Sequence, residues 1–239
     1  MRLAPTVLAV IVMLIVILGT LWLRRGPTEE YNPAIDPAFF VPSVTNKYFT
    51  LMPGTKYLYE SKTNVGTERI EVEVTNERKQ VLGIPVTVVR DRVYLDEVLL
   101  EDTRDWYAQD TSENVWYFGE EVSNYENGQF KDNAGAWEAG VDGAKPGIVM
   151  PADPKVGDSY RQEYYRGKAE DMGDIVALGK SVTVPYGTFN DCLQTRDWSR
   201  IEKTLNEFKY YCPSVGFLVK EENVSDASEK SELVDIVKQ

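Results

Sequence analysis

The chain has 239 residues, with 38 acidic side chains, 26 basic side chains, a formal net charge of −12 and no histidine. This acidic balance excludes a basic surface for nucleic acid. The lack of histidine excludes Ser-His-Asp and Cys-His hydrolases, histidine-ligated haem and nearly all catalytic zinc sites. No GxxxxGK[ST] or GxGxxG motif is present, so the sequence predicts no nucleotide cofactor.

Residues 3–23 form an apolar segment, LAPTVLAVIVMLIVILGTLWL, which ends at Arg24 and Arg25. About 20 apolar residues cross a bilayer core of roughly 30 Å. A cleaved signal peptide is the alternative, but its apolar region is usually shorter and ends at a small-residue site. We therefore predict that residues 1–25 are a membrane anchor with one N-terminal transmembrane helix, and that the membrane is the partner of residues 3–23.

The charges flanking this segment are nearly balanced, so they do not fix its orientation. Residues 26–239 contain 23 of the basic side chains and all 38 acidic ones, a net charge of −15. Anionic lipid head groups and nucleic acid repel such a domain. We expect it on the extracytoplasmic face of the membrane, in the periplasm or at the cell surface.

The chain beyond the anchor divides into a linker and one β domain. Residues 26–47 contain four prolines and little periodicity, which predicts an extended linker. Residues 48–239 contain many short runs rich in β-branched and aromatic residues, and one short helix is predicted at residues 171–178. The predicted fold class is mainly β, with an antiparallel sheet that forms a barrel or a strongly curved half-barrel.

The two cysteines lie in the arms of a predicted hairpin. If its register is symmetric, residues whose numbers sum to 404 face each other, and Cys192 and Cys212 become cross-strand neighbours. A disulfide then fits an oxidising compartment. The alternative is two buried free thiols.

Carboxylates and aromatic rings alternate between residues 105 and 142 of the sequence. Three functions compete for this cluster: an aromatic-walled pocket for a sugar, lipid or peptide, a Ca²⁺ site, and a glycosidase with two catalytic carboxylates. A fourth interpretation is that the aromatic residues form the core and the acids its solvated rim. Alternation along the strands assigns Trp106, Trp116 and Phe118 to the core side.

Residues 137–159 contain four glycines and three prolines, and we expect them to form an ordered loop over an end or the concave face of the sheet. The site that this loop would cover gives the candidate ligand-binding residues Asp105, Tyr107, Asp110, Tyr117, Glu120, Trp137, Glu138 and Asp142. No catalytic residue is assigned. The only metal considered is Ca²⁺.

The segments DWYAQD, VWYFGE and WEAGVDGAKPGI belong to a larger set of segments spread over residues 46–237. Together, in this order, these segments resemble a family of bacterial exported or membrane-anchored proteins with no assigned activity. The resemblance implies a bacterial, extracytoplasmic setting, and it implies that residues 105–110 and 137–148 form a shared surface.

These observations favour a membrane-anchored binding or interaction module of the bacterial envelope, and a non-enzymatic role over an enzymatic one. The alternatives are a carboxylate-based glycan hydrolase and a structural envelope protein without a small-molecule site. Protein partners and the ligand are not identified by the sequence.

Overall fold

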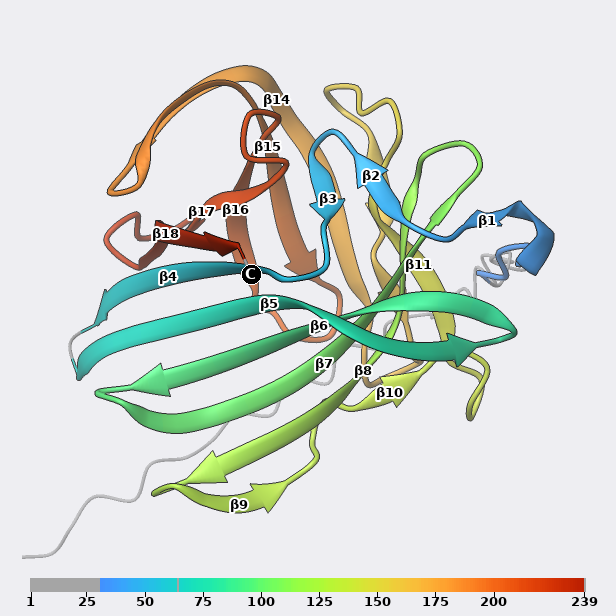
Figure 1. The fold of residues 1–239 in the computed structure, drawn as a ribbon, viewed down its shortest axis with the longest axis horizontal. Coiled ribbons are helices and arrows are strands. Elements are labelled where there is room, and N and C mark those ends of the chain that lie inside the picture. The colour runs from blue at the N-terminus through green and yellow to red at the C-terminus, as the bar shows by residue number, and fades with distance from the viewer. Residues whose placement is uncertain (1–30, 64, 239) are drawn as a thin grey trace, which may run out of the picture. The chain divides into compact units, whose positions relative to one another are not determined.

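A computed structural model describes residues 31–63 and 65–238, which form almost entirely β-structure (Figure 1). One turn of 3₁₀ helix, η1 (Pro37–Phe39), comes first. The strands of the first half are β1 (Phe40–Val41), β2 (Val44–Asn46), β3 (Phe49–Leu51), β4 (Thr55–Thr63), β5 (Gly66–Val81), β6 (Ile84–Leu95), β7 (Val98–Asp110), β8 (Val115–Glu126) and β9 (Gln129–Asp132). Those of the second half are β10 (Trp137–Glu138), β11 (Lys145–Met150), β12 (Ser159–Arg161), β13 (Glu163–Tyr164), β14 (Asp171–Val184), β15 (Gly187–Ser199), β16 (Asn206–Cys212), β17 (Phe217–Asn223) and β18 (Lys230–Lys238).

The sheet is antiparallel and nearly closes on itself, as Figure 1 shows. Its strand order is β12-β14-β15-β16-β17-β18-β4-β5-β6-β7-β8-β11-β13. The two ends of this order, β12 and β13, are consecutive in the chain and separated only by Gln162. One continuous segment therefore pairs with β14 on one side and with β11 on the other. The prediction of a mainly β, antiparallel and barrel-like fold is confirmed.

Gly147 permits this closure. A Cβ atom at this position of β11 would overlap the backbone of Arg161 and Gln162 at the seam. Gln162 then donates its backbone N–H to the carbonyl oxygen of Asp171 at 2.9 Å. A side chain at residue 147 would push the seam apart.

Two groups of buried side chains lie on opposite faces of β6, β7 and β8. Val89 and its neighbours face the interior of the barrel and belong to the larger core. Val88, Trp106 and Phe118 belong to a second core on the other face. Trp106 and Phe118 are buried, and Trp116 is half-buried against them, in agreement with the side assigned from alternation.

The predicted linker extends too far along the chain. β1 pairs with β7, β2 pairs with β3, and Val44 is buried in the larger core. Phe40 packs against Phe118 with ring centroids 5.5 Å apart. Residues 40–47 therefore belong to the β domain, because their apolar side chains are buried by it.

Two further sequence predictions concern helices. The short helix predicted at residues 171–178 is wrong: these residues begin β14, which hydrogen-bonds to β12 and β15. Pairing on both edges overrides the local sequence preference. The predicted transmembrane helix, residues 3–23, lies outside the described residues. Within the part of the chain that the structure describes, no helix has the length and apolar character to cross a membrane.

The hairpin of β15 and β16 has the symmetric register expected from the sequence. Leu193 pairs with Tyr211, and Thr195 pairs with Lys209. Cys192 and Cys212 form a disulfide across these strands. A cross-link that closes a loop of this size stabilises a folded chain by about 3 kcal/mol.

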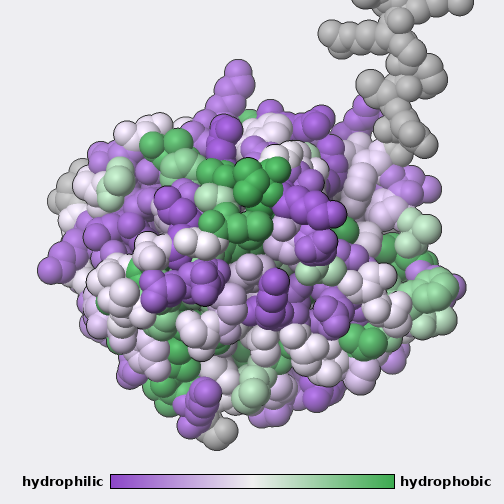
Figure 2. All heavy atoms as spheres, turned by 90° about the horizontal axis from the view of Figure 1, so that it is seen from above, coloured by the Kyte–Doolittle hydropathy of each residue, from purple (hydrophilic) through white to green (hydrophobic). Residues whose placement is uncertain are grey.

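The outer surface is polar. Figure 2 shows one face, on which hydrophilic side chains surround a smaller group of apolar ones. Ion pairs run across the outside of β4, β5 and β6, where Lys56 Nζ lies 3.4 Å from Glu71 and 3.5 Å from Glu73. Water reaches these partly exposed pairs on the outside of the sheet and screens them, so each contributes little to stability.

Candidate functional site

The interior of the barrel contains a cavity of about 250 Å³, which we call the inner cavity. Aromatic, acidic and amide side chains line it together with a single lysine. The lining residues are Phe49, Tyr107, Tyr117, Glu120, Val149, Gln162, Glu163, Asp171, Asp197, Lys209 and Tyr211. They come from β3, β7, β8, β11 and β14–β16, and from the segment of residues 159–164 that closes the barrel. Most of the barrel therefore contributes to the cavity.

An irregularity in strand pairing places Tyr117 and Glu120 on the same side of β8. Asp105 pairs with Glu120 and Tyr107 pairs with Tyr117, so β8 has one more residue than β7 between these pairs. In a regular strand, residues three apart would face opposite sides. The extra residue is a β-bulge that includes Gly119, which has a φ of +123°. The bulge therefore turns Glu120 towards the inner cavity.

Gly119→Ala is expected to destabilise the protein by roughly 3 kcal/mol. A Cβ atom at this position would overlap the carbonyl oxygen of Trp137, and the backbone conformation is strained for any L side chain. Urea unfolding of the full chain in detergent measures the loss.

Gly128→Ala is the matched control, because Gly128 also has a positive φ, of +74°, but no atom lies within 4 Å of its Cβ position. Its loss should be about 1 kcal/mol, from backbone strain alone. Equal losses in the two variants would contradict a packing role for Gly119.

Three carboxyl groups next to the cavity have raised pKa values. Burial raises the pKa of Asp105 to about 7, although the Tyr117 hydroxyl donates a hydrogen bond to its Oδ1 at 2.7 Å and acts in the opposite direction. Burial, followed by the negative charges of Asp105 and Glu163, raises the pKa of Glu120 to about 9. Burial and the charge of Asp171 raise the pKa of Glu163 to about 8. Near neutral pH this group can both donate and accept protons.

Lys209 lies between two acids on the other side of the cavity. Its Nζ is 3.3 Å from Asp197 Oδ2 and 3.3 Å from Glu221 Oε2. Burial acts to lower the pKa of Lys209, but the charges of Glu221 and Asp197 outweigh it and hold this pKa well above its usual value. Lys209 is therefore a buried ammonium group.

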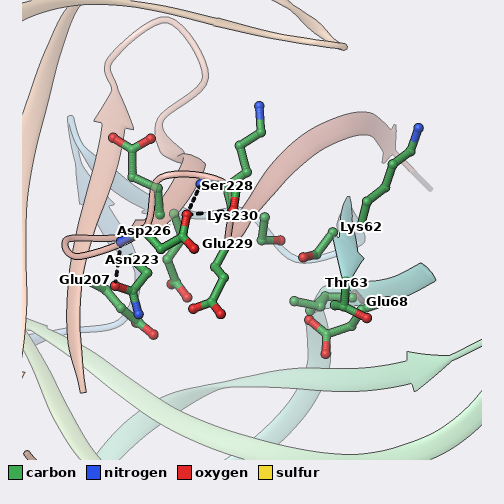
Figure 3. Close-up of a pocket in the computed structure, with 14 residues that line it drawn as sticks. Lys62, Thr63, Glu68, Glu207, Asn223, Asp226, Ser228, Glu229 and Lys230 are labelled. Atoms are coloured by element: carbon green, nitrogen blue, oxygen red, sulfur yellow. Dashed lines mark hydrogen bonds between the residues drawn. The ribbon is translucent and has the colours of Figure 1, made fainter. Parts of the chain in front are cut away.

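A second cavity of about 430 Å³, the outer pocket, adjoins the first. Glu207 and Glu221 line it, so the Lys209–Glu221 ion pair separates the two cavities. Burial, and then the charge of Glu221, raises the pKa of Glu207 to about 7. In Figure 3, Lys62 and Lys230 extend away from the carboxylates that line this pocket. Lys230 pairs instead with Glu232 at 2.9 Å.

Four of the eight candidate residues from the sequence lie together: Asp105, Tyr107, Tyr117 and Glu120. The rings of Tyr107 and Tyr117 stack with centroids 5.0 Å apart, and both residues line the inner cavity. Trp137 is buried beside them, with its ring edge-on to Tyr117 at 5.4 Å.

The other three candidates lie elsewhere. Asp110 organises the turn between β7 and β8, where it accepts hydrogen bonds from Ser112, Asn114 and Trp116. Glu138 pairs with Lys79 at 2.8 Å, and Asp142 is exposed at a turn with a φ of +50°. The loop predicted at residues 137–159 is also partly wrong, because it contains β10 and β11, which pair with β8 and form part of the barrel wall.

The candidate residues from the sequence did not include eight of the eleven residues that line the inner cavity, among them Glu163, Asp171, Asp197, Lys209 and Tyr211. A signal was available for two of them. The symmetric register of the β15–β16 hairpin pairs Thr195 with Lys209 and Asp197 with Glu207, which places charged residues on neighbouring strands. No signal identified Glu163, because the seam places it opposite β11 only through long-range closure.

Within the described residues, no group of three or more acidic or cysteine side chains is arranged to hold a metal ion.

Comparison with known proteins gives one structural similarity. No family model matches the chain, and no curated protein matches it. Among solved structures, a "putative lipoprotein" from Parabacteroides distasonis is similar, with a TM-score of 0.41 and 13% identity over 80% of this chain and 98% of that one.

Proposed function

We propose that this protein is a binding module of the bacterial envelope that takes a small polar ligand into the inner cavity. The observation on which this depends is the cavity itself, a space of about 250 Å³ inside the barrel that aromatic rings and charged tips line together. Ligand sites combine apolar walls with a few polar groups in this way, and many exceed 300 Å³. The ligand is therefore small.

The proposal includes the location of the domain. Residues 3–23 are long and apolar enough to anchor it, and the Cys192–Cys212 disulfide fits an oxidising compartment. Protease treatment of intact cells tests this location, because an extracytoplasmic domain would be digested while a cytoplasmic one would survive.

Thermal melting of the full chain against sugars, short peptides, lipids and amines tests the binding function. A ligand at one hundred times its dissociation constant should stabilise the folded state by about 2.7 kcal/mol. Val149 lines the inner cavity, so Val149→Phe should fill part of it and abolish the shift. Val156→Phe is the control, because Val156 is exposed and lies outside the cavity lining.

If no compound of any class shifts the melting temperature, or if both variants keep the shift, the inner cavity is not a binding site. A structural envelope protein without a small-molecule site would then be the better description.

A glycan hydrolase is the second candidate, and the pairing of Asp105 with Glu120 favours it. Their pKa values of about 7 and about 9, raised mainly by burial, would keep one of them protonated as an acid near neutral pH. A hydrolase needs two such carboxyl groups across an open cleft, whereas Asp105 is not among the residues that line the inner cavity and accepts a hydrogen bond from the Tyr117 hydroxyl. Hydrolysis of an aryl glycoside that Glu120→Gln abolishes would favour this function over simple binding.

A further inference from the structure

The inner cavity has more acidic than basic side chains. Four carboxyl groups line it, those of Glu120, Glu163, Asp171 and Asp197, and Lys209 is the one lysine or arginine in the lining. Lys209 lies against Asp197 and Glu221, on one side of the cavity. On the other side, Glu120 and Glu163 enter no ion pair with any residue that the structure describes.

Asp91 is another buried acid of the interior, although it is not among the residues that line the inner cavity. Its Oδ1 atom is buried and has no hydrogen-bond partner among the described residues. Burial, and then the charge of Asp105, raises the pKa of Asp91 well above its usual value, so this group holds a proton. A cation that enters the interior would favour the release of that proton.

Lys209 shows how this interior accommodates an ammonium group. Two carboxylates hold its Nζ at 3.3 Å each. The opposite side of the cavity offers the carboxyl groups of Glu120 and Glu163 in the same way. Tyr107 lies between Phe49 and Tyr117, with ring centroids 5.2 Å and 5.0 Å away. Such rings attract a cation through their faces and pack against its carbon atoms.

Resting on the proposed function, we propose that the ligand of the inner cavity is a small organic amine, whose ammonium group lies between Glu120 and Glu163 and whose apolar part lies against Tyr107 and Tyr117. Near neutral pH burial keeps Glu120 and Glu163 protonated, and an ammonium group between them would displace these protons and leave carboxylates as its partners. A neutral molecule of the same shape forms no such ion pair, and an anion finds no cation on this side of the cavity. The cavity therefore selects its ligand by charge.

The experiment compares three probes of equal shape, benzylamine, benzyl alcohol and benzoate, by calorimetric titration of the full chain in detergent. Benzylamine should bind at least tenfold more tightly than benzyl alcohol, and benzoate should show no binding. Equal or tighter binding of the alcohol or of benzoate would overturn the amine proposal and leave the binding function intact. If none of the three binds, the amine proposal fails, and the separate screen of sugars, peptides and lipids decides whether the binding function fails with it.

Variants locate the bound amine. Glu163→Gln and Glu120→Gln should each weaken benzylamine binding at least tenfold, because an amide cannot release a proton and become the negative partner of the bound ammonium group. Glu138→Gln is the matched control, because Glu138 follows Trp137 on β10 but pairs with Lys79 outside the cavity. The affinity of this variant for benzylamine should equal that of the unchanged protein. Unchanged binding in both cavity variants would place the amine elsewhere and refute the proposal, with circular dichroism used to verify that each variant is folded.

Discussion

Lys209→Met is expected to destabilise the folded domain by about 3–5 kcal/mol at pH 7, because it leaves the buried carboxylate of Asp197 without its counter-charge. Lys209 Nζ lies 3.3 Å from both Asp197 and Glu221, and Asp197 is only 4% exposed. Breaking such a pair by removing one partner is more harmful than replacing the whole pair. Urea unfolding of the full chain in detergent measures the effect. Adding Asp197→Asn to the variant should restore part of the lost stability.

Lys56 provides a matched control. It also contacts two glutamates at about the same distances, and its side chain is 20% exposed compared with 25% for Lys209. The difference is location, because Lys56 alternates with the buried Tyr57 and so faces the outside of the barrel. Lys56→Met should therefore destabilise by less than about 1 kcal/mol. Similar losses for the two lysines would show that the interior is as well solvated as the surface.

Stability is expected to fall as the pH rises from 5 to 9. Burial raises the pKa values of Asp105 to about 7, Glu163 to about 8 and Glu120 to about 9, whereas unfolded carboxyl groups titrate near 4. Over this range the folded protein holds protons that the unfolded chain has released, so the free energy of unfolding decreases with pH. The negative charge of Glu101 further raises the pKa values of Asp105 and Glu120, and that of Asp171 raises the pKa of Glu163. The positive charge of Lys209 acts to lower the pKa of Asp105.

Glu163 alone, with its pKa at about 8, contributes on the order of 4 kcal/mol to this fall, which corresponds to a drop in melting temperature of roughly 10 °C. Differential scanning calorimetry of the full chain between pH 5 and pH 9 measures it. Glu163→Gln should flatten the profile, because the amide cannot ionise, and Glu138→Gln should leave its slope unchanged. A melting temperature that is constant or rises towards pH 9 would contradict the buried, protonated state of these acids.

The fold class follows from local rules that hold in this chain. Leu82 and Gly83 have φ values of +52° and +79° and connect β5 to β6, and Asn127 and Gly128 do the same between β8 and β9. Two-residue turns of this kind set the register of a hairpin without help from distant residues. Alternation between these turns then separates Trp106 from Asp105 and Tyr107. Antiparallel pairing between neighbours in sequence is therefore predictable.

The candidate site was only half predictable, because it depends on closure. Asp105, Tyr107, Tyr117 and Glu120 lie on one hairpin, so their proximity follows from sequence order. The bulge that includes Gly119 breaks strict alternation, and alternation alone would have placed Glu120 on the wrong side. Glu163 and Lys209 reach the same cavity only when the seam closes, and no local pattern encodes that contact.

The position of β18 between β17 and β4 has a consequence for biosynthesis. While a ribosome is still adding residues 230–238, the edges of β4 and β17 have no strand between them, and the ring of strands stays open. The ring of strands cannot close before residues 230–238 have been synthesised, since the first long strand, β4, pairs with β18. Contacts between segments so far apart in the sequence slow folding.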